Sequence, residues 1–133
     1  MFEIKKSTSV EGDYALMAQS AKSIIDGEKD VIANLANISA VINSYMDNII
    51  WVGFYIFKSG ELVLGPFQGR PACVRIKPGK GVCGTAFIEK GPVIVDDVEK
   101  FPGHIACDSN SRSEIVLPIL KGNEVFGVLD IDS

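Results

Sequence analysis

Two pairs of strand-like runs, each joined by a short polar turn, constrain the fold of this chain most strongly. Residues 49–57 are rich in branched and aromatic side chains, and strand character resumes at 61–67 after a Lys-Ser-Gly turn. A second pair, 114–120 and 125–131, flanks a turn at 121–124. The sequence therefore predicts two antiparallel hairpins.

Two helix-forming segments precede the first hairpin. Apolar residues recur with mostly helical spacing across 13–25, and Gly27 is placed to end that segment. A second helix is expected to begin near Asp30 and to run to the break at 46–48. An apolar helix stripe must be buried against something, and the sheet supplies that surface.

The stretch between the hairpins is rich in glycine and proline. It predicts a short strand at 74–76, a short helix at 85–90, a brief strand at 93–95 and a loop at 96–112. Loops of that length are usually functional or mobile. These loops are expected to contain all three cysteines of the chain, Cys73, Cys83 and Cys107. The fold class that follows is α+β, an antiparallel sheet with helices on one face and active-site loops on the other.

Composition narrows the class of function. The chain has 133 residues, which suits one hydrophobic core, and a formal charge of −4, which argues against a surface that neutralises phosphates. We therefore expect no nucleic acid partner. Neither a secretory h-region nor an apolar stretch near the ~20 residues of a membrane helix is found, so no membrane association is expected. An odd number of cysteines fits the reducing cytoplasm.

Seven runs of the sequence carry a family resemblance. They are Trp51–Tyr55, Leu64–Gly69, Pro71–Cys73, Gly81–Thr85, Phe101–Asp108, Ser113–Ile115 and Gly127–Ser133. Together they resemble the free methionine-(R)-sulfoxide reductases, which are small enzymes of GAF fold. The last run is common among GAF domains generally, whereas the placement of the three cysteines is far more specific. The resemblance implies a single GAF domain over residues 1–133.

One departure from the family concerns the end of the chain. Members of the family usually continue past this last run into a carboxy-terminal helix, and the sequence stops at Ser133. We expect either that the chain is truncated there or that a partner subunit covers the apolar surface that such a helix would bury.

The resemblance assigns roles to the cysteines. Cys107 would attack the sulfoxide and be left as sulfenic acid, and Cys73 would condense with it to a disulfide. A thioredoxin-type reductant would then open the disulfide, and Cys83 can act as an alternative resolving thiol. No cofactor is implied. Without the family, free cysteines in such a chain also serve as small buried apolar residues.

Three acids complete the predicted site. Asp130 and Asp132 lie two apart on the last strand, so both point to one face, and clustered carboxylates there would retain a proton for the leaving oxygen. By resemblance Asp132 would contact the sulfoxide oxygen, with Glu114 and Asp130 shared between that oxygen and the substrate ammonium. The alternative is that these acids form a solvated strand edge.

The register of the second hairpin tests this convergence. A two-residue loop at Gly122-Asn123 would pair Glu114 with Ile131 and turn Glu114 away from the aspartates. A shared face therefore predicts either a three-residue loop or a bulge near Pro118.

Other residues allow two interpretations. Trp51 and Tyr55 are four apart on the first strand and share a face, where they form either a wall for the substrate methyl group or ordinary core. His104 either lowers the pKa of the Cys107 thiol or is a solvated bystander. The wide gaps between the cysteines do not fit a structural zinc site, so no metal is expected.

The sequence thus favours an enzyme that reduces free methionine-(R)-sulfoxide. The alternative is a non-enzymatic GAF module that binds a small ligand or senses redox state through its disulfide. Homodimers are frequent among GAF proteins, and a homodimer is expected here by analogy.

Overall fold

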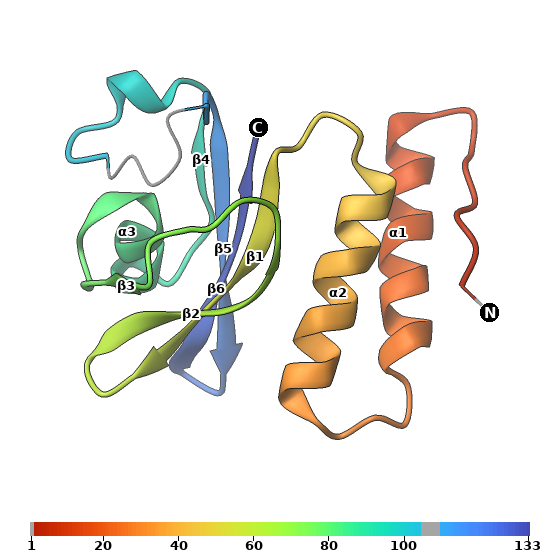
Figure 1. The fold of residues 1–133 in the computed structure, drawn as a ribbon, viewed down its shortest axis with the longest axis horizontal. Coiled ribbons are helices and arrows are strands. Elements are labelled where there is room, and N and C mark those ends of the chain that lie inside the picture. Colours follow the sequence, from red (N-terminus) through yellow and green to blue (C-terminus); the bar gives the residue numbers. More distant parts are fainter. Residues whose placement is uncertain (1, 105–109) are drawn as a thin grey trace.

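A curled antiparallel sheet lies between a pair of helices on one side and a third helix with long loops on the other (Figure 1). This computed structural model describes residues 2–104 and 110–133. The elements in chain order are α1 (Val10–Ile25), α2 (Val31–Tyr45), β1 (Trp51–Lys58), β2 (Glu61–Gln68), β3 (Arg75–Ile76), α3 (Gly81–Glu89), β4 (Val93–Val95), the short 3₁₀ helix η1 (Val98–Lys100), β5 (Glu114–Lys121) and β6 (Glu124–Asp132). The predicted α+β arrangement is confirmed.

The strands follow the order β3-β2-β1-β6-β5-β4. Both predicted hairpins form, β1 with β2 and β5 with β6, and they join where β1 pairs with β6. Trp51, the first residue of β1, is therefore opposite Asp132, the last residue of β6. The first and the last residue of the sheet, 81 positions apart in the sequence (132 − 51), are therefore direct neighbours across two strands.

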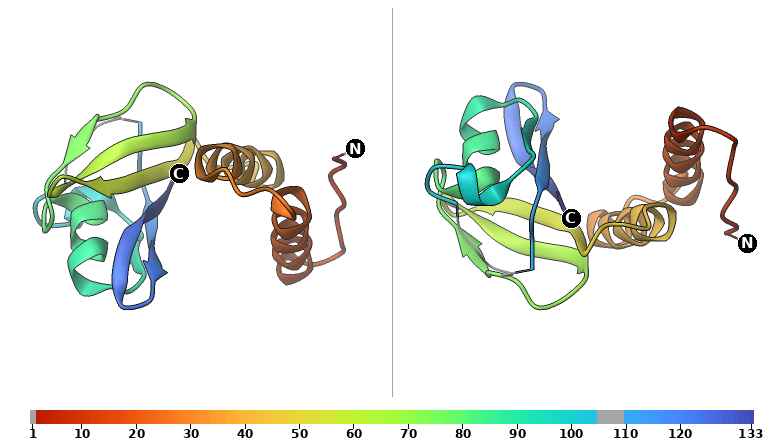
Figure 2. Two further views of the ribbon diagram at one scale, coloured as in Figure 1. Left: turned by 90° about the horizontal axis from the view of Figure 1, so that it is seen from below. Right: turned by 90° about the horizontal axis from the view of Figure 1, so that it is seen from above.

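The two long helices cover one face of the sheet in successive layers, as the end views show (Figure 2). Helix α2 packs on β1 and β2 through buried residues that include Leu35 and Ile42. Helix α1 packs on α2 and buries none of its own residues fully. The Asp30 side chain accepts a hydrogen bond from the Ala33 N–H (2.8 Å), which caps α2 at the predicted start.

Helix α3 corrects one prediction. It begins at Gly81, four residues before the expected start at 85, so Cys83 lies in its first turn instead of in a loop. Gly79 and Gly81 adopt positive φ angles of 81° and 64°, which let the chain turn sharply into the helix. The sequence predicts a later start for this helix, and glycine is indeed a weak helix former.

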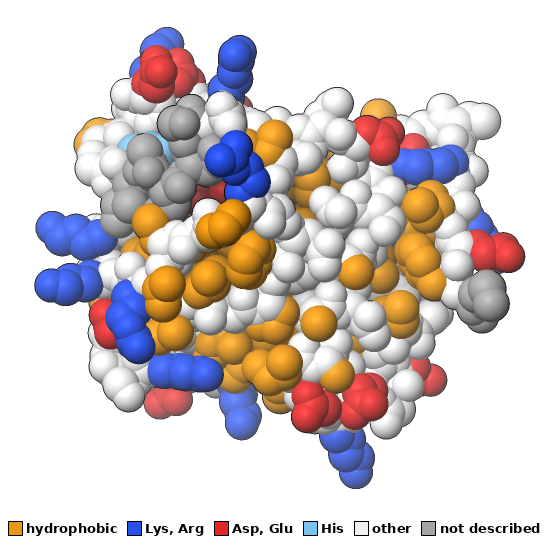
Figure 3. Space-filling model, viewed as in Figure 1, with side chains coloured by type: hydrophobic (Ala, Val, Ile, Leu, Met, Phe, Trp, Pro, Cys, Tyr) orange, Lys and Arg blue, Asp and Glu red, His pale blue; other side chains and the backbone are white. Residues whose placement is uncertain are grey.

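The surface is mixed in character. Hydrophobic side chains lie across the centre of the face seen in Figure 3, and charged side chains lie mostly around its rim. Among the described residues, every helix is too short or too polar to cross a membrane.

Candidate functional site

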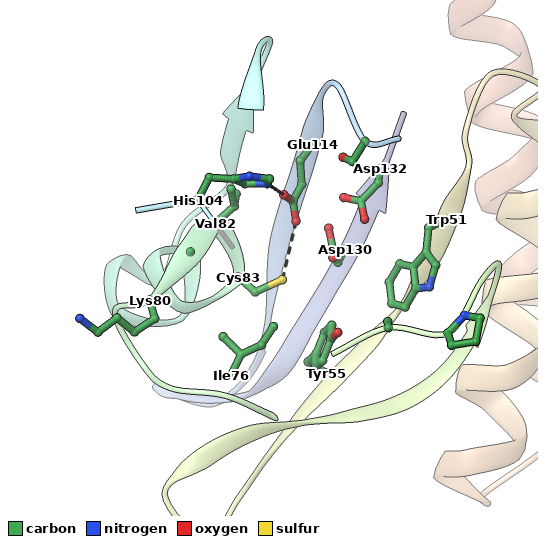
Figure 4. Close-up of a pocket in the computed structure, with 14 residues that line it drawn as sticks. Trp51, Tyr55, Ile76, Lys80, Val82, Cys83, His104, Glu114, Asp130 and Asp132 are labelled. Carbon is green, nitrogen blue, oxygen red and sulfur yellow. Dashed lines mark hydrogen bonds and ion pairs between the residues drawn. The ribbon is translucent and has the colours of Figure 1, made fainter. Parts of the chain in front are cut away.

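A pocket opens on the face of the sheet opposite α1 and α2, between β1, the ends of β5 and β6, and α3 (Figure 4). Its lining is Trp51, Tyr55, Pro71, Ala72, Ile76, Lys80, Gly81, Val82, Cys83, His104, Ser111, Glu114, Asp130 and Asp132. Of the eight residues predicted for the site, six line this pocket. Cys73 directly follows Ala72, and Cys107 lies outside the described residues.

A β-bulge places the three acids on one face. The turn of the β5–β6 hairpin has two residues, since Lys121 pairs with Glu124. The register then shifts between Ile119 and Leu120, so that Glu114 pairs with Asp132 and not with Ile131. The predicted bulge near Pro118 is thereby confirmed. The acid side chains point into the pocket (Figure 4).

Aromatic rings form the opposite wall. Trp51 stacks on Tyr55 at 6.1 Å between ring centroids and on Phe67 at 5.2 Å. The rings approach closely because Gly53, between Trp51 and Tyr55 on β1, has no side chain; a Cβ there would meet the Trp51 ring at 2.7 Å. Both predicted residues therefore belong to the pocket wall and to the core at once, with Trp51 3% and Tyr55 2% exposed.

The same two side chains attach the segment that carries Cys73. Trp51 Nε1 donates to the Arg70 carbonyl (3.1 Å), and the Tyr55 hydroxyl donates to the Cys73 carbonyl (2.8 Å). Burial, together with the negative charges of the pocket, raises the pKa of Tyr55, so its hydroxyl keeps its proton and remains a donor. The backbone at Cys73 is thus fixed against β1.

Cys83 points into the pocket from the first turn of α3. It is a free thiol, 3% exposed, and its Sγ donates to Glu114 Oε2 over 3.9 Å. Burial raises the pKa of this thiol well above its usual value, and the neighbouring acids raise it further. At neutral pH Cys83 is therefore a protonated thiol and a weak nucleophile.

Asp130 is the buried member of the acid cluster, with 6% of its surface exposed. Burial raises its pKa well above the usual value, and the hydrogen bond with Glu114 and the charge of Asp132 act in the same direction. Asp130 Oδ1 is buried with no hydrogen-bond partner among the described residues. The same carboxyl group therefore combines a raised pKa with an acceptor atom that has no partner among the described residues.

His104 contacts the cluster from the side of η1. Its Nε2 lies 3.6 Å from Glu114 Oε1, and the two side chains are 15% and 9% exposed. The interpretation of His104 as a solvated side chain is therefore wrong, because the imidazole is largely buried and contacts Glu114, an acid of the pocket.

The acids and the thiol could also hold a metal ion. One ligand atom each from Cys83, Glu114 and Asp130 lies within 4.8 Å of the other two. The ligands come from α3, β5 and β6, far apart in the sequence, which is why ligand spacing gave no sign of this cluster.

Sequence reasoning missed several residues of the lining. Ser111 Oγ is buried, with no hydrogen-bond partner among the described residues. Lys80 lies at the pocket edge, but its amino group points away from the acids (Figure 4). The position of Ser111 depends on backbone bonds from Arg112 and Ser113 to the Ser133 carbonyl (2.7 and 3.0 Å), and no local sequence pattern predicts these bonds.

Comparison with known proteins agrees with this geometry. The GAF domain family matches residues 30–133, and the fold and pocket define the chain as a GAF domain protein. Protein YtsP of Bacillus subtilis is 51% identical over 136 residues, which cover 100% of this chain and 83% of that protein. The free methionine-R-sulfoxide reductase of Escherichia coli is 49% identical over 120 residues, covering 90% of this chain and 73% of that protein.

Solved structures extend the comparison to three dimensions. The X-ray structure of free methionine-R-sulfoxide reductase from Neisseria meningitidis in complex with its substrate is 46% identical, with a TM-score of 0.91, and the match covers 100% of this chain and 81% of that chain. Within the GAF domain proteins, this chain belongs to the family of free methionine-R-sulfoxide reductases.

Proposed function

We propose that this chain reduces free methionine-(R)-sulfoxide to methionine in the pocket between β1, β6 and α3, by a sulfenic acid and disulfide cycle at Cys107 and Cys73. The observation that carries the proposal is the convergence of an aromatic wall and a buried acid cluster beside the segment that ends at Cys73. Reduction of a sulfoxide needs a proton for the leaving oxygen, and the raised pKa of Asp130 favours this carboxyl as the donor.

The first half of the cycle is the reduction of the substrate. The Cys107 thiolate attacks the sulfoxide, the sulfur–oxygen bond breaks, and the oxygen passes to Cys107 with one proton from the cluster. The substrate is thereby reduced to a thioether, and Cys107 is oxidised to sulfenic acid. Asp132 contacts the departing oxygen, and the raised pKa of Asp130 supports it as the group that stores the proton.

The second half restores the thiols. The Cys73 thiol attacks the sulfenic sulfur and releases water, and a disulfide forms. A thioredoxin-type dithiol then reduces the disulfide by exchange. Cys83 remains an alternative resolving thiol, although its burial and protonated state favour Cys73.

The pocket also supplies contacts for a zwitterionic amino acid. The apolar faces of Trp51 and Tyr55 suit the methyl group, and Glu114 with Asp130 suits the ammonium. Ser111 Oγ and Asp130 Oδ1, which lack partners among the described residues, would gain them from a polar ligand. A single-domain chain, a cytoplasmic location and a homodimer stay predictions from the sequence.

The decisive assay offers the two diastereomers separately. Purified protein is incubated with the R or the S form of free methionine sulfoxide and a thioredoxin system, and methionine is quantified. We expect turnover of the R form only. Cys107→Ser should abolish it. With no small-molecule thiol added to the thioredoxin system, Cys73→Ser should limit turnover to about one methionine per chain.

The competing sensor function predicts a different result. Equal inactivity with both forms, while small ligands still bind in the pocket, would contradict the proposed reaction. Turnover of both forms at similar rates would contradict its stereospecificity.

A further inference from the structure

The proposed cycle uses the Cys83 thiol and the acids that face it one at a time, but these groups also form a compact set of possible metal ligands. Cys83 Sγ lies 3.9 Å from Glu114 Oε2, and the ligand atoms of Cys83, Glu114 and Asp130 are all within 4.8 Å of one another. His104 Nε2 is 3.6 Å from the second oxygen of Glu114. A thiol and two carboxylates thus face one point of the pocket, and the imidazole of His104 lies behind Glu114 (Figure 4).

These distances are close to those of a tetrahedral zinc site. Zinc binds sulfur at about 2.3 Å and oxygen at about 2.0 Å, so neighbouring sulfur and oxygen ligands are about 3.5 Å apart. The observed 3.9 Å between Cys83 Sγ and Glu114 Oε2 needs only a small contraction. A thiolate sulfur beside carboxylate oxygens suits Zn²⁺ better than the hard cations Mg²⁺ and Ca²⁺.

A second observation, the unsatisfied hydrogen bonding of one buried oxygen, also points to a bound cation. Asp130 is 94% buried (100 − 6) and lines the pocket, and its Oδ1 has no hydrogen-bond partner among the described residues. A buried acceptor without a partner is costly. A cation would satisfy this oxygen and offset the repulsion among the buried acids.

We propose that the pocket binds one Zn²⁺ ion through Cys83, Glu114 and Asp130, with His104 orienting Glu114 from its second oxygen. The site is inhibitory, because the ion occupies the acids that the substrate needs. Binding itself depends only on the cluster, whereas the competition with methionine sulfoxide rests on the proposed function.

The first experiment measures binding of zinc alone. Reduced wild-type chain is stripped with a chelator and titrated with Zn²⁺ by calorimetry, without substrate. We expect one ion per chain, and affinity at least about tenfold weaker in Cys83→Ser and in Glu114→Gln. Glu124→Gln is the matched control: it makes the same chemical change on an exposed residue at the start of β6, and its affinity should equal that of the wild type.

The second experiment identifies the thiol directly. In a Cys73→Ser/Cys107→Ser variant, Cys83 is the sole thiol. Titration with Co²⁺ should give the thiolate-to-cobalt charge-transfer absorption and the visible bands of tetrahedral cobalt, and Zn²⁺ should bleach both. This readout remains informative even if Cys83→Ser fails to fold.

Each result decides the matter. Absence of zinc binding, equal affinity in all the variants, or a cobalt spectrum without thiolate absorption would overturn the site. If zinc binds as described and methionine sulfoxide does not weaken it, the site stands and its inhibitory role is wrong. If zinc binds but neither diastereomer is reduced, the site stands and the proposed reaction fails.

Discussion

Cys83 and Asp130 show how strongly the environment changes the chemistry of a single side chain. Both are buried against each other and against Glu114, and both have raised pKa values, chiefly because burial penalises their charged forms. Burial therefore makes the thiol less nucleophilic, and it makes the carboxyl group easier to protonate. The sequence predicted that the acids cluster. It did not predict that Asp130 is the most buried of them, because that depends on how β6 packs between β1 and β5.

The reactivity of Cys83 follows from its burial. In the reduced native chain, alkylation of Cys83 by iodoacetamide at neutral pH should be at least about tenfold slower than that of an exposed thiol, because the thiolate is scarce and access is poor. Peptide mass spectrometry after timed quenching measures the rate. Unfolding in denaturant should remove the protection, and rapid labelling of the native chain would show that the thiol is ionised.

Asp130 should lower stability at neutral pH. A carboxyl whose pKa is raised on folding binds more protons in the folded state, so stability falls as pH rises from the unfolded pKa of about 3.9 toward the folded one. Asp130→Asn removes this cost and should raise the midpoint of thermal unfolding at pH 7, measured by circular dichroism with a chelator present. The gain should vanish near pH 3. A gain that persists there would refute a titration origin.

At the scale of the elements, hairpin β5–β6 decides whether the acids meet. The alternation of the strands predicts either a three-residue loop or a bulge near Pro118, because only these registers bring Glu114 beside Asp132, and the bulge is the alternative that forms. The early start of α3 was not predictable, because it depends on close packing around Gly84, where a Cβ would meet the Lys77 carbonyl at 2.6 Å. Local patterns do not encode such tertiary contacts.

Gly127 illustrates the same limit on the other side of the hairpin. A Cβ at this position of β6 would clash with the Tyr55 carbonyl and lie 3.1 Å from Ile56 Cα, both of them backbone atoms of β1. Gly127→Ala should therefore reduce the free energy of unfolding by about 1–3 kcal/mol, as overpacking commonly does. Urea unfolding tests this value. Gly91→Ala is the control, because its Cβ would meet only one atom, at 3.9 Å.

At the scale of the whole molecule, the sheet separates stability from chemistry. Its helix-facing side packs against α2 through clusters that include Leu35, Phe54 and Ile56, and its other side carries the pocket. The sequence predicted these two sides from helices placed before strand pairs. It did not predict that Ser111 lines the pocket, because the position of Ser111 depends on backbone hydrogen bonds between the residues before β5 and Ser133.

Leu35 tests this separation. Leu35→Ala removes a buried side chain that contacts the sheet on the helix side, and should lower the free energy of unfolding by about 2–5 kcal/mol. The kcat/KM for methionine-(R)-sulfoxide, measured where the variant is fully folded, should stay within about twofold of wild type. A large loss of kcat/KM in the folded variant would mean that the two sides are energetically linked.

The stacked ring of Trp51 has a practical consequence. The chain contains one tryptophan, and this residue lines the pocket between Tyr55 and Phe67. Its intrinsic fluorescence therefore reports on the pocket alone, because no other tryptophan contributes to the signal. Stopped-flow emission can therefore follow the arrival and departure of a ligand in real time, without any added dye.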